Sequence, residues 1–186
     1  MTIATQPIAL EEFLKLPETK PASKYIEGEI FQKPMPKSKH SRLQLRICNT
    51  IAQLTESQKI AYAFPELRCT FGGRSLVPDI AVLLWNRIEF DDRGEPVDDV
   101  RVAPDWTIEI LSPEQSPNRV TGNILHCLQY GSQLGWLIDP GDRSILVFFP
   151  NQQPKLFTGD DIVPVPNGIF LNLTNNLVFS WLKMTE

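Results

Sequence analysis

The sequence predicts an α/β domain with a mixed central β-sheet flanked by helices. Two observations predict this class. Short strand-like segments alternate with segments of helical periodicity, and sixteen prolines and ten glycines divide the chain into short elements. At 186 residues, 42% of them hydrophobic and 22% charged, the chain can bury a core without disulfides or a structural metal. We therefore expect residues 1–186 to form a single domain.

The N-terminal third is expected to hold a short helix, a strand and a long helix. Residues 8–16, IALEEFLKL, have the pattern of a short amphipathic helix that ends before Pro17. Residues 24–34, KYIEGEIFQKP, alternate in the manner of a strand that bends at Gly28. From Ser38 onward, apolar side chains recur at helical spacing, which predicts the clearest helix of the protein.

The rest of the chain alternates further strands with one more long helix. The expected elements are, in order, strands at 61–64, 67–71, 76–85 and 105–113, a helix at 118–133, and a strand pair at 135–140 and 144–150 that turns at Pro140 and Gly141. A turn at Gly72 and Gly73 should separate the second and third of these strands. Residues 160–186 are typical of an edge strand followed by a short helix.

Composition and charge exclude several classes of protein. Eighteen basic and 22 acidic residues give a formal charge of -4, which argues against coating nucleic acid through bulk electrostatics. No apolar run reaches the roughly 18 to 20 residues that a membrane span requires, and the N-terminus lacks the pattern of a secretory signal. We therefore expect a cytoplasmic protein.

Cysteine and histidine are too few and too scattered for a structural zinc site. Cys48, Cys69 and Cys127 lie far apart without metal-ligand spacing, and His40 and His126 are the only histidines. The cysteines are expected to be small buried hydrophobic residues, and His126 a buried helix residue.

One local segment is strongly basic. Between residues 31 and 55 the chain has five cations and no acid. The cations are Lys33, Lys37, Lys39, Arg42 and Arg46. The segment is either a solvated helix face with its leading loop, or its part from Lys37 to Arg46 contacts the phosphates of a nucleic acid, which attract cations whatever the base sequence.

Two carboxylates stand within apolar, strand-like segments. Asp79 precedes the run from Ile80 to Leu84, and Glu109 lies between Ile108 and Ile110. Carboxylates on adjacent strands at one end of a sheet would repel one another unless a cation neutralised them. Magnesium, or manganese, accepts carboxylate oxygens, retains waters and supports phosphodiester hydrolysis. The residues alone leave open that Asp79 caps a turn and that Glu109 pairs with an arginine.

A proline and aspartate that open a strand, followed by an acid on the next strand, resemble the PD-(D/E)XK nuclease superfamily. The phrases YIEGEIFQKPMP, PELRCTFGGRSLVPDIAV, APDWTIEILSP and GWLIDP resemble its branch of bacterial restriction-type endonucleases of unknown role. They span Tyr25 to Pro140, about two thirds of the chain. The resemblance implies a restriction endonuclease-like fold and magnesium-dependent DNA cleavage, with Asp79 and Glu109 as the metal ligands.

The chain departs from the pattern of this superfamily at the lysine. The superfamily places a lysine two residues after the second acid, where this chain has Leu111. In the resembled branch the lysine lies on the following helix, at the position of Asn123. Arg119 stands one turn earlier on the same helix face. Since arginine has a pKa above about 12 and cannot act as a neutral base, a metal would have to activate the water if Arg119 replaces the lysine.

His40 and Glu29 are weaker candidates for the catalytic site. His40 begins the long helix, where the superfamily often places another polar active-site residue, although a capping or packing role is also open. Glu29 belongs to the phrase EGEI that the resemblance repeats, but a half-exposed strand glutamate needs no special role.

Two functional hypotheses follow. The first is a magnesium-dependent endonuclease that hydrolyses DNA phosphodiester bonds, with Arg119 near the scissile phosphate. The second is a catalytically degraded relative that acts as a binding or assembly module. The missing lysine and the acidic net charge favour the second hypothesis, as does the apolar stretch SILVFF at 144–149, which suits a homodimer interface.

Overall fold

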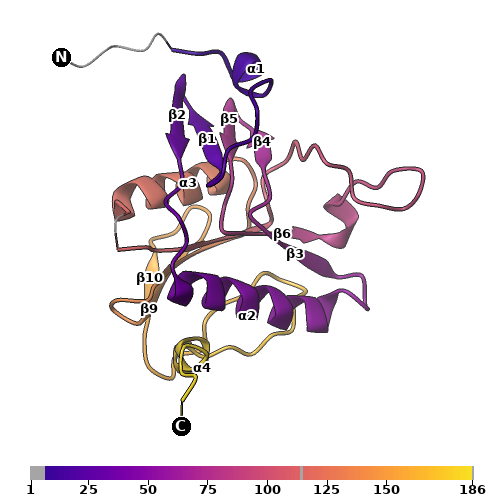
Figure 1. Cartoon of the computed structure of the whole chain (residues 1–186). Helices are drawn as coiled ribbons and strands as arrows, with labels where there is room; N and C mark the ends of the chain where they lie inside the picture. Colours follow the sequence, from indigo (N-terminus) through magenta and orange to yellow (C-terminus); the bar gives the residue numbers. More distant parts are fainter. Residues whose placement is uncertain (1–6, 114, 186) are drawn as a thin grey trace, which may run out of the picture.

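The computed structural model describes residues 7–113 and 115–185, and a six-stranded mixed sheet lies at its centre (Figure 1). The strand order is β10-β9-β8-β7-β6-β3. β7 and β8 are parallel, and all other neighbours in this sheet are antiparallel. The strands are β3 (Ala61–Pro65), β6 (Ile80–Leu84), β7 (Trp106–Ile110), β8 (Leu134–Asp139), β9 (Ser144–Phe148) and β10 (Lys155–Phe157). The predicted α/β class with a mixed sheet is confirmed.

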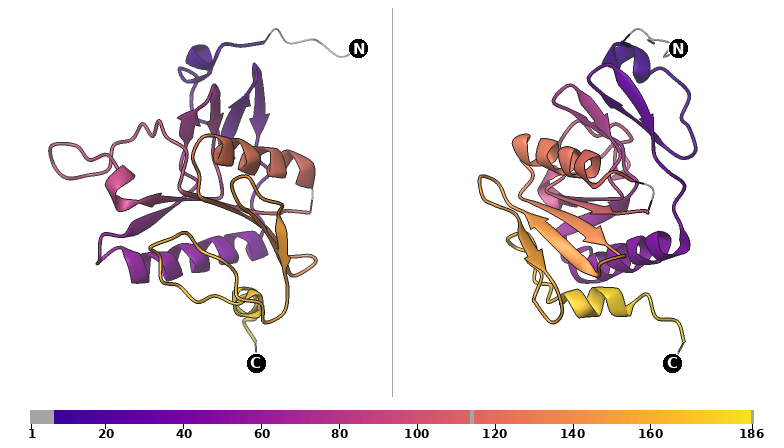
Figure 2. Two further views of the ribbon diagram at one scale, coloured as in Figure 1. Left: turned by 180° about the vertical axis from the view of Figure 1, so that it is seen from behind. Right: turned by 90° about the vertical axis from the view of Figure 1, so that its left-hand side faces the viewer.

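A second, antiparallel sheet of four strands stands beside the first, on the N-terminal side (Figure 2). Its order is β2-β1-β5-β4, and its strands are β1 (Ser23–Ile26), β2 (Glu29–Gln32), β4 (Cys69–Phe71) and β5 (Arg74–Leu76). The segment expected to form one bent strand is therefore a hairpin. Glu27 and Gly28, with φ of 51° and 90°, form the two-residue turn between its strands.

Helices cover both faces of the large sheet (Figures 1 and 2). The helices are α1 (Leu10–Phe13), α2 (Ser38–Thr55), the 3-10 helix η1 (Trp85–Arg87), α3 (Pro117–Gln129) and α4 (Asn175–Ser180). α2 packs on one face through Leu43, Ile47 and Ile51, which are fully buried. α3 packs on the opposite face through Val120 and Ile124 and connects the parallel strands β7 and β8, which no short turn could join.

Most predicted elements are present, with three corrections besides the hairpin. The strand expected at 76–85 is divided between β5 and β6. The chain leaves the small sheet after Leu76, passes Pro78, which lacks an N–H group, and joins the large sheet at Ile80. The helix expected at 8–16 is shortened to α1. Within the described tail, Ile162 and Thr174 form only an isolated bridge, and the edge strand is the earlier β10.

Burial agrees with the sequence for the cysteines and His126, but not for the proposed interface strand. Cys48, Cys69 and Cys127 are free and buried. By contrast, β9 lies between β8 and β10, and Ile145, Val147 and Phe148 in it are buried, so these side chains are not available at a dimer surface. In the described part of the chain, every helix is too short or too polar to cross a membrane.

Candidate functional site

The structure brings together the two carboxyl groups that the sequence singled out. In the antiparallel pair β6 and β7, Ile80 stands opposite Ile108, and continuing this register by one residue places Asp79 opposite Glu109. Directly opposite residues in such a pair have Cβ atoms roughly 4.5 to 5.5 Å apart. Asp79 is 0% exposed and Glu109 is 5% exposed, so both charges sit in the protein interior.

Asp79 is compensated by three donors. Nζ of Lys33 lies 2.6 Å and Nε2 of His40 lies 3.4 Å from Oδ1, and the N–H of Ile110 donates to Oδ2 at 2.7 Å. Burial alone would raise the pKa of Asp79, but hydrogen bonding by His40 and the charge of Lys33 outweigh burial and lower the pKa to about 2. Asp79 therefore remains a buried carboxylate, and its partners come from other elements rather than from a local turn.

Lys33 is the most important residue that the sequence analysis misplaced. The sequence places it in a basic surface segment, but only 9% of it is exposed, and its Nζ also donates to the carbonyl of Val77 at 3.1 Å. Burial lowers the pKa of Lys33, but the charges of Asp79 and Glu109 act in the opposite direction, and the net shift is upward. Lys33 is therefore a permanently charged partner of the site.

Glu109 is compensated only in part. Burial and the nearby charge of Asp79 raise the pKa of Glu109 to about 8, and the opposing effects of Lys33, Lys24 and a hydrogen bond from Asn123 offset this only in part. Among residues 7–113 and 115–185, no lysine, arginine or histidine forms an ion pair with Glu109, so the alternative of an arginine partner is not found. At neutral pH Glu109 keeps a proton that a cation could replace.

A pocket of about 350 Å³ lies over Glu109, between the β1–β2 hairpin and α3. The hairpin supplies Lys24, Phe31 and Lys33. Lys24 stands opposite Phe31, and the N–H of Lys33 donates to the carbonyl of Ala22, so the three side chains lie on one face of the hairpin. α3 supplies Arg119 and Asn123. The register of the hairpin places the two lysines on the same face. The sequence could show this only if the segment was recognised as a hairpin that turns at Gly28, rather than as one bent strand.

Arg119 and Asn123, which the sequence proposed, both lie in this pocket. The guanidinium carbon of Arg119 is 4.8 Å from the ring centre of Phe31. Asn123 is 5% exposed, and its Oδ1 is buried without a hydrogen-bond partner. Such an unsatisfied acceptor is costly to bury and is typical of a place where a ligand or water binds.

His40 and Glu29 lie in different surroundings. His40 is buried at the start of α2, where its Nδ1 lies 3.4 Å from Oγ of Ser112. It lines a second cavity of about 490 Å³, and Gln115 lines both cavities. Glu29 is exposed at the turn end of β2 and does not line either cavity. The structure therefore places His40, but not Glu29, beside the carboxylates.

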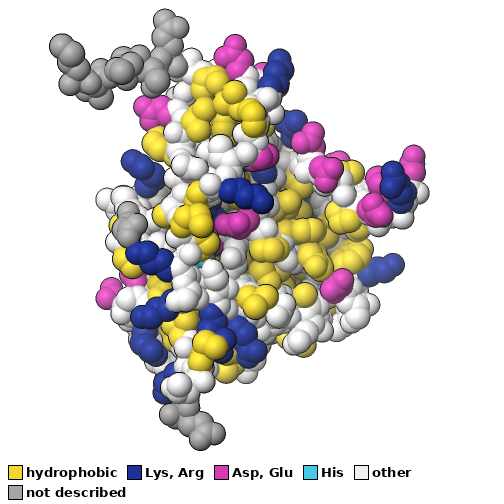
Figure 3. Space-filling model, viewed as in Figure 1, with side chains coloured by type: hydrophobic (Ala, Val, Ile, Leu, Met, Phe, Trp, Pro, Cys, Tyr) yellow, Lys and Arg dark blue, Asp and Glu magenta, His cyan; other side chains and the backbone are white. Residues whose placement is uncertain are grey.

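The basic segment is mostly engaged in holding the fold together. Arg42 donates to the carbonyl of Trp181, and the guanidinium carbon of Arg46 lies 5.6 Å from the ring centre of Trp181, beside α4. Lys37 and Lys39 line the second cavity. On the visible face, basic side chains gather on the side where α2 and α3 begin, whereas acids gather on the loop between η1 and β7 (Figure 3).

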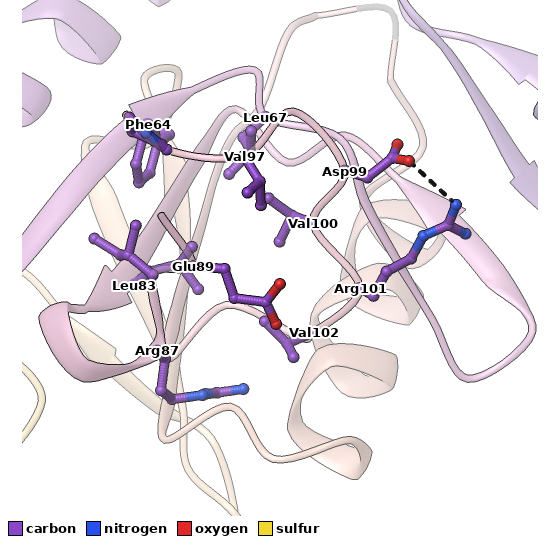
Figure 4. Close-up of a pocket in the computed structure, with 12 residues that line it drawn as sticks. Phe64, Leu67, Leu83, Arg87, Glu89, Val97, Asp99, Val100, Arg101 and Val102 are labelled. Carbon is purple, nitrogen blue, oxygen red and sulfur yellow. Dashed lines mark ion pairs between the residues drawn. The ribbon is translucent and has the colours of Figure 1, made fainter. Parts of the chain in front are cut away.

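A third pocket, beneath that acidic loop, offers no comparable chemistry. It holds only about 30 Å³ and is walled mainly by apolar side chains, among them Phe64, Leu83 and Val100 (Figure 4). Asp99 and Arg101 at its rim pair with each other at 3.6 Å. We therefore place the functional site at the carboxylates rather than here.

Comparisons with known proteins identify the family of the chain. The model of the Uma2 family, described as "Putative restriction endonuclease", matches residues 10–177. A crystal structure described as "a putative nuclease belonging to DUF820", from Anabaena variabilis ATCC 29413, is 54% identical with a TM-score of 0.93, and the match covers 95% of this chain and 100% of that chain. None of the curated proteins compared with the chain matches it. The chain therefore belongs to the Uma2 family, within the restriction endonuclease-like superfamily.

Proposed function

We propose that this site hydrolyses phosphodiester bonds in DNA with a divalent cation, Mg²⁺ or Mn²⁺, held by Asp79 and Glu109. The supporting observation is a pair of buried carboxyl groups on adjacent strands, one of which, Glu109, lines a pocket of about 350 Å³ whose other charged lining groups are cations. The carboxyl groups favour a metal ion, and the cations favour an anionic substrate. A phosphodiester beside a bound metal ion satisfies both.

Two features of the residues present fit such an ion. Glu109, with a pKa of about 8, holds a proton that a cation would displace, and Oδ1 of Asn123 is an unsatisfied acceptor in the same pocket. The described residues contain no cluster of three or more His, Cys, Asp or Glu side chains, so waters would complete the coordination, as they normally do for Mg²⁺. When bound, the ion would activate water and offset the charge that develops on the phosphate.

The lysines of the hairpin have different tasks in this proposal. Lys33 is held by Asp79 and by the carbonyl of Val77, so it acts as a positioning residue that keeps Asp79 ionised and oriented. In the part of the chain that the structure describes, the ammonium group of Lys24 has no hydrogen bond or ion pair. Its charge interacts with Glu109, and burial lowers its pKa. Its ammonium group is therefore available to a phosphate oxygen and takes the place of the lysine that is missing at Leu111.

The reaction itself is a displacement at phosphorus. The oxygen of a water molecule forms a bond to phosphorus, and the bond from phosphorus to one sugar oxygen breaks. One proton of the water ends on the released hydroxyl group, and the other is lost from the new terminal phosphate to solvent. Lys24 and Arg119 counter the added negative charge, while Arg119 cannot accept a proton.

Isosteric variants of the two acids test this proposal. Asp79→Asn and Glu109→Gln should each abolish Mg²⁺- and Mn²⁺-dependent cleavage of plasmid and single-stranded DNA and remove the heat of Mn²⁺ binding in calorimetry. Circular dichroism well below the unfolding temperature should show that each remains folded, although Asp79→Asn should be less stable because Lys33 loses its partner. Glu95→Gln, in the exposed loop before β7, is the matched control. A wild-type protein that is inert toward DNA with both metals would overturn the proposal.

One observation favours a second candidate, a binding or assembly module without catalysis. Lys33, His40 and the N–H of Ile110 already compensate Asp79 without any metal, and Leu111 stands where the superfamily has its lysine. The same calorimetric experiment separates the two candidates. A folded wild-type protein that binds neither Mg²⁺ nor Mn²⁺ near neutral pH would be such a module.

A further inference from the structure

We propose that the substrate of this site is single-stranded rather than duplex DNA, and that Phe31 and Arg119 form a platform on which a base beside the scissile phosphate stacks. This substrate class rests on the proposed function and deepens it. The depth of the acids, the contact between Phe31 and Arg119, and the distribution of cations support it.

The two acids are too deep for a phosphate that is held in a duplex. Asp79 and Glu109 are 0% and 5% exposed, and the pocket over Glu109 is confined between the hairpin and α3. Phosphates of a stacked duplex lie along a stiff cylinder and reach only groups that project from a protein surface. A single strand can bend its backbone into such a pocket at little cost, whereas a stiff duplex would have to be deformed locally to bring a phosphate to it.

The pocket mouth has the parts of a base platform. The guanidinium carbon of Arg119 lies 4.8 Å from the ring centre of Phe31, Arg119 is exposed and Phe31 is half-buried. Phe31 shares its hairpin face with Lys24, which faces the same pocket. An aromatic ring or a guanidinium plane next to a cation is the combination that binds a base and its phosphate in single strands, with little dependence on sequence.

The distribution of cations also disfavours a duplex. A duplex is held by many phosphate contacts over an extended basic surface. The net charge here is -4, and among the basic side chains on the side where α2 and α3 begin, Arg42 and Arg46 contact Trp181. The site instead has two adjoining cavities of about 350 and 490 Å³ that share Gln115 and lie on the Lys33 and His40 sides of Asp79. A flexible strand could occupy both in succession.

The test compares three substrates with Mn²⁺: a labelled single-stranded oligonucleotide, the same strand annealed to its complement, and bis(p-nitrophenyl) phosphate. We expect the wild type to hydrolyse the ester and to cleave the single strand at least about tenfold faster than the duplex. Phe31→Leu should raise KM for the single strand by about tenfold. Arg119→Met should raise KM by a similar factor and also lower kcat, because Arg119 counters the added negative charge. Phe90→Leu, an exposed phenylalanine far from the pocket lining, is the matched control.

An abasic substrate separates stacking from a general loss of activity. The cut positions are mapped first, and the base next to the cut phosphate is then removed from the substrate. This removal should lower kcat/KM about tenfold for the wild type and should leave the kcat/KM of the Phe31→Leu variant unchanged. Duplex cleavage as fast as single-strand cleavage, or an equal abasic effect in both proteins, would overturn the substrate class but leave the hydrolase standing. If neither the ester nor either DNA is hydrolysed, the proposed function itself fails.

Discussion

Nζ of Lys33 lies 2.6 Å from Oδ1 of Asp79, and the two side chains are only 8% and 1% exposed. The two residues are 46 positions apart in the sequence, and their contact joins the end of the β1–β2 hairpin to the start of β6. The ion pair therefore connects the small sheet to the large one at the point where the carboxyl groups meet. Breaking it should affect both the fold and the site.

Lys33→Met is expected to destabilise the protein by about 3 to 5 kcal/mol, because it leaves the buried carboxylate of Asp79 without its main cation. Urea denaturation measures this change in the free energy of unfolding. Lys39→Met, on an exposed position of α2, is the control and should change stability by less than about 0.5 kcal/mol. The double variant Lys33→Met with Asp79→Asn should cost less than the sum of the single variants, and strictly additive costs would contradict the pairing.

Glu109→Gln should remove a pH dependence of stability. The pKa of Glu109 is raised from 4.5 to about 8 in the folded protein, so between these values the folded state holds a proton that the unfolded state has lost. Wild-type stability without metal therefore falls as pH rises through this window, by up to about 1.4 kcal/mol per pH unit, and is level above it. Urea titrations in EDTA should show a stability difference between wild type and variant that changes across the window. A difference that stays constant would refute the raised pKa.

Lys24→Met should lower kcat for DNA cleavage by about 100-fold, because it removes the cation available to the phosphate. Calorimetric Mn²⁺ binding should persist, since Lys24 is not a metal ligand. Adding Asn123→Lys to this variant should restore part of the rate, because residue 123 lines the same pocket from α3. Lys183→Met, in the exposed tail after α4, is the control. A Lys24→Met enzyme with wild-type kcat would show that this ammonium group plays no part.

Gly135→Ala should destabilise the protein by about 1 to 3 kcal/mol through overpacking. A Cβ atom at this position of β8 would lie 2.2 Å from Cγ2 of Ile124 in α3, which is fully buried. The missing side chain thus lets α3, with Arg119 and Asn123, approach the sheet. Ile124→Ala removes the obstructing group, so the double variant should lose less stability than the sum of the two. Urea denaturation measures each value, and simple additivity would count against the clash.

Glu29→Gln should leave DNA cleavage within about twofold of wild type, because Glu29 is exposed and lies outside both cavities. Steady-state rates with Mn²⁺ measure the effect. A loss comparable to that of Glu109→Gln would show that the sequence was right to place Glu29 among the catalytic candidates and that the hairpin moves when substrate binds.

The sequence by itself determined the local elements and the two acids. The apolar spacing after Ser38 indicated α2, and the apolar strands around Asp79 and Glu109 predicted that these acids would be neighbours, which the register of β6 and β7 agrees with. These inferences succeeded because periodicity is set by residues close in sequence, each of which must face either core or solvent.

Only the tertiary structure decided which cations accompany the acids. Lys24 and Lys33 line the pocket because the hairpin of the small sheet packs beside α3 and the end of β7 in the large sheet. Arg42 and Arg46 do not form the expected phosphate-binding surface because they contact Trp181. Such contacts join residues far apart in the chain. Their partners are selected by the burial of charge and apolar area in the whole fold, for which no local pattern exists.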